Sequence, residues 1–182
     1  MIPLNRHGPG ILLRKLKRWF EPDLDPHRVG KVFDEFDRVR GFAAWQDHCR
    51  ARLQRPLPDD AANLDLVVMH LVYHDSVWMG VDRTGMNAAI WKALKPGGEF
   101  AVIDHSAKDG TGSDAAKELH RIEKKFVQAE IEQTGFKLDR ESDLFAHPED
   151  TRDWSASPSA AADKRGQSDR FVLVFKKPVD AK

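Results

Sequence analysis

Residues 64–105 decide the fold of this chain. They begin with LDLVVMHL at 64–71, continue with MNAAIWKAL at 86–94 and end with KPGGEFAVIDH at 95–105. The first stretch is a continuous apolar run, typical of a strand that is buried on both faces. In the second, apolar residues recur three and four positions apart, which predicts a helix. The Pro-Gly-Gly turn stops that helix, and a second buried strand follows it.

The same alternation of strands and helices continues on both sides of this stretch. Apolar and polar patterns predict one more strand before it and two after it, with helical segments between them and a loop before the last strand. These elements are a strand at 29–33, a polar helix that ends near Leu53, a long helix at 114–134, a strand starting at 136–138, a loop at 155–168 and a last strand at 171–175.

Strands that alternate with helices at this spacing indicate an α/β fold with an open, mostly parallel sheet and helices on both faces. We expect residues 64–70, 99–104 and 171–176 to be adjacent or near-adjacent strands of one sheet. The helices at 83–95 and 114–134 should pack on its faces.

Composition excludes several classes of protein. Lys+Arg and Asp+Glu both number 29 among 182 residues, which argues against a protein that coats nucleic acid. Cys49 is the only cysteine, so an internal disulfide framework is excluded and a reducing, cytoplasmic location is the default. The apolar runs are too short for a membrane span.

The chain divides at about residue 28. Residues 1–28 include a basic segment, 11–20, whose apolar side chains recur at helical spacing, and this predicts an amphipathic helix. Such a helix could bind an anionic surface, but an apolar stripe packed on the core is the more common arrangement. Residues 29–182 are expected to form the α/β domain.

Polar residues follow two of the predicted strands. Ligands of open α/β sheets bind beyond the carboxyl ends of the strands, and neighbouring parallel strands end at the same edge. We therefore expect one cleft lined by the residues that follow the strands at 64–70 and 99–104, namely His70, Tyr73, His74, Asp75, Asp104 and His105.

Three readings of these residues stay open at this point. A metal could use His70 and His74, but ligands four residues apart need a helix, and His70 ends a strand, so no metal is predicted. A metal-dependent hydrolase using His70, His74, Asp104 and His105 is the corresponding minor alternative. Each residue could also simply satisfy backbone groups at a strand end. A Ser-His-Asp hydrolase is disfavoured because no Gly-x-Ser-x-Gly sequence occurs.

Several of these segments resemble one protein family. ANLDLVVM at 62–69 and LKPGGEF at 94–100 resemble the fourth strand, fourth helix and fifth strand of class I S-adenosylmethionine-dependent methyltransferases, and PLPD at 56–59 resembles the segment before that fourth strand. More narrowly, three short segments resemble a group of bacterial predicted methyltransferases, namely YHD at 73–75, VIDH at 102–105 and SDRFVL at 168–173. The resemblance covers about residues 29–178.

The resemblance implies a seven-stranded sheet of order 3-2-1-4-5-7-6, with the last strand antiparallel and inserted beside 136–138. It implies S-adenosylmethionine as cofactor and methyl transfer, and the neutral, mixed-charge composition favours a small-molecule acceptor. The six residues of the expected cleft would then be the catalytic ones. The cofactor would be bound by Asp34 (the acid after strand two), Arg52, Leu53, Met69 and His70.

One element of that family is missing from the sequence. A buried strand and a glycine-rich turn should come first, yet the chain begins MIPLNRHGPG, where only Gly8-Pro9-Gly10 precedes a helix. Because such a turn supplies backbone amides to the cofactor, we expect weak binding of S-adenosylmethionine and an N-terminus that is divergent or truncated. A catalytically impaired, methyltransferase-like binding protein is therefore the main alternative function.

Overall fold

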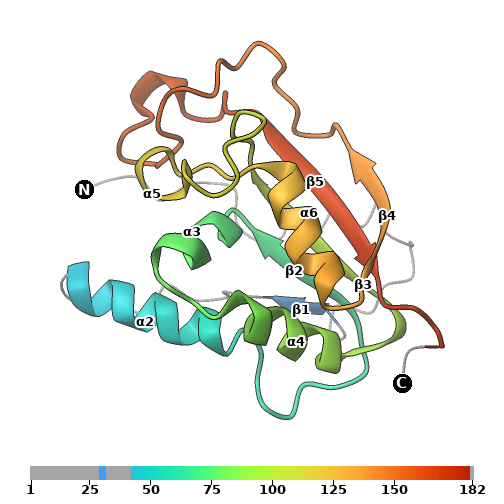
Figure 1. The fold of residues 1–182 in the computed structure, drawn as a ribbon. Coiled ribbons are helices and arrows are strands. Elements are labelled where there is room, and N and C mark those ends of the chain that lie inside the picture. Colours follow the sequence, from blue (N-terminus) through green and yellow to red (C-terminus); the bar gives the residue numbers. More distant parts are fainter. Residues whose placement is uncertain (1–28, 32–41, 181–182) are drawn as a thin grey trace.

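A five-stranded sheet organises the part of the chain that the computed structural model describes, residues 29–31 and 42–180 (Figure 1). The amphipathic helix predicted at 11–20, Gly8-Pro9-Gly10 and Asp34 lie outside these residues. In chain order the elements are β1 (Val29–Lys31), α2 (Phe42–Gln54), β2 (Leu64–His70), α3 (Tyr73–Trp78), α4 (Arg83–Ala93), β3 (Leu94–His105), α5 (Ala116–Leu119), α6 (Lys124–Gln133), β4 (Lys137–Ser142), the short 3-10 helix η2 (Ala162–Lys164) and β5 (Arg170–Lys176).

The strand order is β1-β2-β3-β5-β4. β1, β2 and β3 pair in parallel, whereas β5 runs antiparallel to both β3 and β4. The prediction that the strands at 64–70, 99–104 and 171–176 are neighbours in one sheet is confirmed, as is the reversed last strand beside β4. The order matches the 1-4-5-7-6 part of the expected sheet.

The position of β1 corrects one detail of the expectation. The stretch that begins at Val29 was expected to be the second strand of the family order, followed by the acid Asp34. In the structure β1 pairs directly with β2, with Val29 opposite Leu66, which is the place of the first strand. Because β1 pairs with the apolar β2, which is the fourth strand of the expected order, β1 occupies the position of the first strand and not that of the second.

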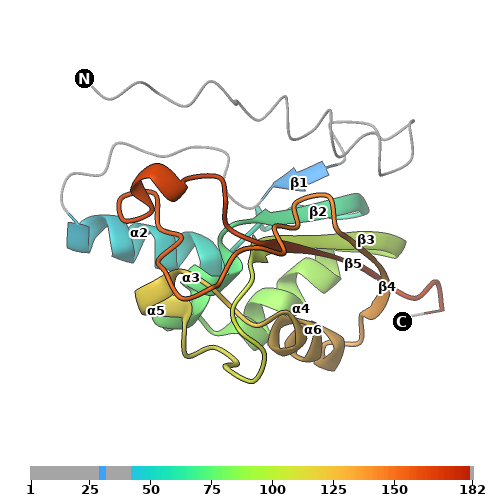
Figure 2. The same cartoon turned by 90° about the horizontal axis from the view of Figure 1, so that it is seen from above.

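Apolar side chains on one face of the sheet form the main core. Alternation along the strands sends Val67, Met69, Phe100 and Val102 to this face, where the helices α2, α3, α4 and α6 pack against them. The second face carries a smaller apolar cluster that includes Leu66. Figure 2 shows the labelled helices together on the first face. Helices on both faces were predicted, and within residues 42–180 they cover one face.

The Lys-Pro-Gly-Gly sequence forms a bulge inside β3 instead of a turn before it. Leu64 pairs with Leu94 and Leu66 pairs with Glu99, so two steps along β2 match five steps along β3. The bulge brings two backbones together: a Cβ atom added to Gly98 would lie 3.0 Å from the carbonyl oxygen of Leu64. The predicted helix at 83–95 therefore ends at Ala93, and the strand begins at Leu94 rather than at residue 99.

The prediction of a single helix at 114–134 is wrong. It is divided into α5 and α6, because His120 takes a left-handed conformation with φ 50° and ends α5. Ile122 then extends alongside the end of β3, where its amide donates to the carbonyl oxygen of His105 and its carbonyl accepts from the amide of Ala107. Burial of Ile122 by this pairing outweighs the helical pattern. Among residues 42–180 no helix has the length and apolar character needed to cross a membrane.

Candidate functional site

The carboxyl ends of β2 and β3 are joined through the start of α3. After β2 the chain turns at Leu71, whose φ is 56° and whose amide donates to the carbonyl oxygen of Ile103. This turn lets α3 begin at Tyr73, beside the end of β3. The N-cap residue, Val72, gives no side-chain hydrogen bond, and Asp104 of β3 takes that role by accepting from the amide of His74 at 2.9 Å.

A buried His–Asp pair forms at this junction. The His74 Nδ1 atom lies 2.7 Å from Asp104 Oδ1, and both side chains are almost entirely buried, at 4% and 0% exposure. Asp104 Oδ1 also accepts from the amide of His105 at 2.7 Å. The carboxylate thus has three donors, which is how a buried charge is stabilised.

The two charges support one another. Burial alone would lower the pKa of His74, but the carboxylates of Asp104 and Asp75 raise it to about 10. For Asp104, burial favours the neutral form, but the charge and hydrogen bonds of His74 outweigh it and lower the pKa of the carboxyl group. His74 is therefore an imidazolium at neutral pH. It orients or donates to a partner and does not act as a general base in that state.

Asp75 and His120 join His74 to form a cluster at the surface. His74 Nε2 lies 3.2 Å from Asp75 Oδ1 and 3.2 Å from His120 Nδ1, and His120 Nδ1 lies 3.6 Å from Asp75 Oδ1. Trp78 donates from Nε1 to Asp75 Oδ1 at 2.9 Å. His120 could not be predicted as a site residue, because the long helix expected there gives no reason to place it beside α3. We call His74, Asp75 and His120 the α3–α5 cluster.

His105 lies near this cluster without belonging to it. Its ring centroid is 6.0 Å from that of His74, and its Nδ1 atom lies 2.8 Å from the Ser168 hydroxyl oxygen. Burial lowers the pKa of His105 to about 3, so the ring is neutral at neutral pH. The structure thus brings four of the six predicted cleft residues, His74, Asp75, Asp104 and His105, to one junction.

Tyr73 does not join them. Its hydroxyl donates to Glu130 Oε2 at 3.2 Å and accepts from Asn87 Nδ2 at 3.1 Å, between α4 and α6. The side chain is fully buried, and burial raises the pKa of its hydroxyl group. Consecutive side chains of a helix point in different directions, so Tyr73 faces the main core although it directly precedes His74.

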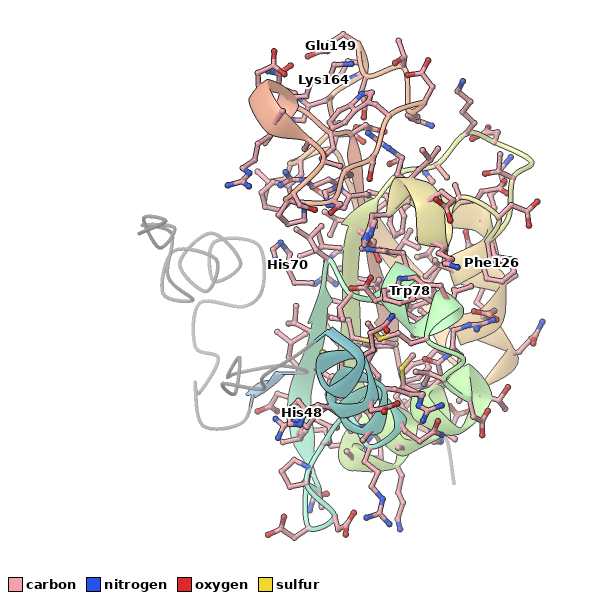
Figure 3. The ribbon with its side chains drawn as sticks, turned by 90° about the vertical axis from the view of Figure 1, so that its left-hand side faces the viewer. His48, His70, Trp78, Phe126, Glu149 and Lys164 are labelled. Carbon is pink, nitrogen blue, oxygen red and sulfur yellow. The ribbon has the colours of Figure 1, made fainter. Side chains whose placement is uncertain are left out.

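His70 also points elsewhere. Residues alternate along β2, and His70 shares the parity of Leu66 and Val68, whose side chains lie on the second face of the sheet. Figure 3 shows His70 and Trp78 on opposite sides of β2. Burial lowers the pKa of His70 to about 4. His70 and His74 therefore cannot share a ligand, and the four residues of the predicted hydrolase site do not face one point.

The residues expected to bind the cofactor differ in how accessible their side chains are. Leu53 and Met69 are fully buried in the main core, so their side chains are not available to a ligand. Arg52 is exposed on α2, and His70 is half-buried at the end of β2. The described residues thus offer a ligand Arg52, His70 and the backbone at the end of β2.

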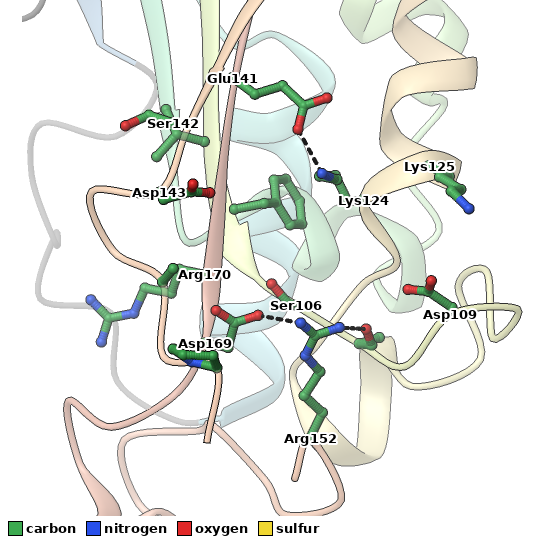
Figure 4. A pocket seen from close by; sticks show the side chains of 15 residues that line it. Ser106, Asp109, Lys124, Lys125, Glu141, Ser142, Asp143, Arg152, Asp169 and Arg170 are labelled. Carbon is green, nitrogen blue, oxygen red and sulfur yellow. Dashed lines mark hydrogen bonds and ion pairs between the residues drawn. The ribbon is translucent and has the colours of Figure 1, made fainter. Parts of the chain in front are cut away.

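A pocket of about 310 Å³ lies beside the end of β3 (Figure 4). It begins at Ser106 and Ala107 and extends between the start of α6 and β5. Charged residues of both signs line it. Arg152 pairs with Asp169 at 2.7 Å and Lys124 with Glu141 at 2.6 Å. The pocket suits a small polar molecule and is too small for a macromolecular partner.

A buried ion pair anchors the segment that forms one wall of this pocket. The Arg121 and Asp150 side chains are both fully buried, and Arg121 Nη1 donates to Asp150 Oδ2 at 2.8 Å. Arg121 also donates to the carbonyl oxygens of Ser106 and Trp154, at 2.9 Å each. Neither residue could be assigned a role from the sequence, since charged side chains 29 positions apart carry no pairing signal.

Comparisons with known proteins found likenesses among solved structures, while no family model and no curated protein matches. A methyltransferase in complex with the Haloferax volcanii activator Trm112 is 18% identical, with 67% of this chain and 57% of that chain covered and a TM-score of 0.45. A [4+2]-cyclase is 15% identical over 75% of this chain and 62% of that chain, with a TM-score of 0.46. An Aquifex aeolicus S-adenosylmethionine-dependent methyltransferase is 12% identical over 93% and 78%, with a TM-score of 0.45.

The chain thus spans 57% and 62% of the length of the first two proteins. The assignment of fold follows from the sheet itself, in which β5 alone is reversed and lies between β3 and β4. The described part of the chain has the strand order and directions of the class I S-adenosylmethionine-dependent methyltransferase fold.

Proposed function

We propose that this chain transfers a methyl group from S-adenosylmethionine to a small-molecule acceptor. The observation that carries the proposal is the position of the buried His74–Asp104 pair. It lies at the carboxyl ends of β2 and β3, in a sheet of whose five described strands β5 alone is reversed. Ligands of open α/β sheets bind at this edge. A cytoplasmic location remains the prediction made from the single cysteine.

The described residues fit the cofactor only in part. Arg52 could contact the cofactor and the backbone around His70 could approach it, whereas the Leu53 and Met69 side chains are buried in the main core. Asp34 lies outside the described residues, and because β1 takes the place of the first strand, the role of the acid after strand two does not carry over to it. When bound, S-adenosylmethionine supplies a methyl group that its sulfonium centre already activates, so the protein needs mainly to align the acceptor and exclude water.

The polar residues of the site would position the acceptor. Asp104 holds the His74 ring in place, and the charged ring can donate a hydrogen bond or stabilise a negative acceptor atom. His120 differs, because burial and the charge of His74 lower its pKa and its side chain is 27% exposed. A neutral, accessible imidazole can accept a proton, so His120 is the best-placed base. Asp104 is a positioning residue.

The pocket beside Ser106 supports a small acceptor. Its volume of about 310 Å³ falls at the lower end of small-molecule sites, and its charged lining favours a polar compound. Ser106 follows His105 directly in the chain, whereas the pocket lining does not include His74, Asp104 or His120, so an acceptor would have to extend beyond the pocket to reach them. Neither feature offers the extended basic surface that a nucleic-acid substrate would need.

The test measures S-adenosylhomocysteine formation with a panel of small polar acceptors, together with calorimetric binding of S-adenosylmethionine. We expect saturable binding and turnover, and we expect Asp104→Asn to lower kcat by about tenfold or more, as removal of a supporting group does. The matched control is Asp65→Asn at the other end of β2, where the carboxylate pairs with Lys95 at 2.7 Å. It should keep full turnover.

Three outcomes would contradict the proposal. Absence of saturable binding would show that S-adenosylmethionine is not a ligand of this chain. Binding without turnover across the panel would favour the alternative of a methyltransferase-like binding protein. Equal kcat values for Asp104→Asn and the wild-type chain, with both folded by circular dichroism, would remove the His74–Asp104 pair from the reaction.

A further inference from the structure

The α3–α5 cluster has the geometry of a metal site. Its three nitrogen and oxygen atoms form a triangle with edges of 3.2, 3.2 and 3.6 Å. Two of these atoms come from consecutive residues of α3, and the third comes from the end of α5. Within the described residues no other group of three His, Cys, Asp or Glu side chains brings its ligand atoms so close together.

A tetrahedral zinc ion would require nearly this triangle. Zinc binds imidazole nitrogen and carboxylate oxygen at about 2.0–2.2 Å, so two ligands of one ion lie about 3.3–3.6 Å apart. The three observed edges agree with that spacing to within about 0.1 Å. We propose that His74 Nε2, Asp75 Oδ1 and His120 Nδ1 bind a divalent zinc ion, with one coordination position left open.

The residues behind the cluster are those that a metal site needs. Histidine ligands usually donate their second ring N–H group to a carboxylate, which fixes the tautomer and the direction of the ring. His74 does so through Nδ1 to the fully buried Asp104, which leaves Nε2 toward the cluster. The indole N–H of Trp78 likewise orients Asp75. Two of the three proposed ligands therefore have an outer partner.

The cluster is also accessible from one side. The His74 side chain is 4% exposed, whereas the Asp75 and His120 side chains are 19% and 27% exposed. An ion could enter past His120, and its fourth position would face the solvent side, as in catalytic zinc sites. His120 reaches the cluster through its left-handed backbone, with φ 50°.

This site differs from the metal site weighed in the sequence analysis. That one paired His70 with His74, which lie on different faces of the sheet, and no metal was predicted from it. The present site replaces His70 by His120. It does not depend on methyl transfer, because zinc uptake is measured without S-adenosylmethionine, and failure of either proposal leaves the other intact. With zinc bound, His74 Nε2 loses its proton and His120 Nδ1 becomes a ligand, so the donor and base roles given above belong to the zinc-free chain.

The test measures zinc binding by the full chain. The protein is treated with a chelator and titrated with zinc chloride in a calorimeter, and bound zinc is counted by elemental analysis. We expect one zinc per chain. His120→Asn and Asp75→Asn should each weaken binding by about tenfold or more, and Asp104→Asn should weaken it by about 10–100-fold through loss of the partner of His74. Asparagine suits position 120 because it tolerates the left-handed conformation.

His147→Asn is the matched control, since His147 lies outside the cluster and its side chain is 36% exposed. It should bind zinc like the wild-type chain. Absence of stoichiometric binding by the wild-type chain would overturn the proposal. Unchanged affinity in both His120→Asn and Asp75→Asn would also overturn it, because the zinc would then lie elsewhere. Circular dichroism of each variant excludes loss of folding as the cause.

Discussion

Removal of one partner from the buried pair of Arg121 and Asp150 should be among the most destabilising single substitutions in the described part of the chain. Asp150→Asn removes the negative charge while it keeps the size of the side chain. Arg121 would then stay fully buried without a counter-charge. Asp150 Oδ2 also accepts a hydrogen bond from the backbone N–H group of Asp169 at 2.7 Å, and the side chain of asparagine has an NH2 group in place of one carboxylate oxygen. Breaking a buried ion pair on one side costs about 3–5 kcal/mol.

That loss is a large fraction of the stability of an ordinary domain, about 5–15 kcal/mol. With a slope of about 2 kcal/mol/M in urea, the midpoint of unfolding should fall by about 1.5–2.5 M. Urea titrations followed by circular dichroism measure this shift. The control is Glu141→Gln, which breaks the exposed pair of Lys124 and Glu141, both more than 40% exposed, and should cost less than about 1 kcal/mol.

A second comparison separates the pair from its surroundings. The double variant Arg121→Met with Asp150→Asn removes both charges, so it should be more stable than the sum of the two single losses predicts. A loss in Asp150→Asn no larger than that in Glu141→Gln would refute the reasoning, and so would strict additivity in the double variant.

Three further predictions concern pH, Tyr73 and the bulge in β3. Below pH 6.5 the unfolded chain protonates His105, while the folded chain does not until about pH 3, so the free energy of unfolding should fall by about 1.4 kcal/mol per pH unit from this group. Unfolding of His105→Asn at pH 7 and pH 5 should show a smaller loss than the wild-type chain, and an identical loss would contradict this. Tyr73→Phe should cost about 0.5–1.5 kcal/mol in urea unfolding and leave methyl transfer unchanged, and a large fall in kcat would return Tyr73 to the site. Gly98→Ala should lower stability by about 1–3 kcal/mol, since its Cβ would meet backbone oxygens of Leu64 and Lys95, and a thermal melt equal to that of wild type would disprove the close approach.

The regular elements around the main core were predictable because their signals are local. The apolar run of β2 and the helical spacing in α4 depend on residues a few positions apart, and burial reinforces both. The helix predicted for 114–134 failed where a non-local contact, the pairing of Ile122 with the end of β3, replaced helical hydrogen bonds. Gly97 and Gly98 lie where the sequence predicts a turn that ends the helix, but they form a bulge within β3, and the pairing of that bulge with β2 could not be seen in the sequence.

The sequence by itself determined which strands are buried and that polar residues follow β2 and β3. Apolar periodicity and turn residues are properties of short segments, and they survive without knowledge of their neighbours. Only the tertiary structure decided which of those polar side chains meet. Side chains point to opposite faces along a strand and rotate around a helix from one residue to the next. The side chains of Tyr73 and His70 therefore point away from the junction, while His74 contacts Asp104. His120 joined from 46 positions away, because a single left-handed residue ends α5 beside α3.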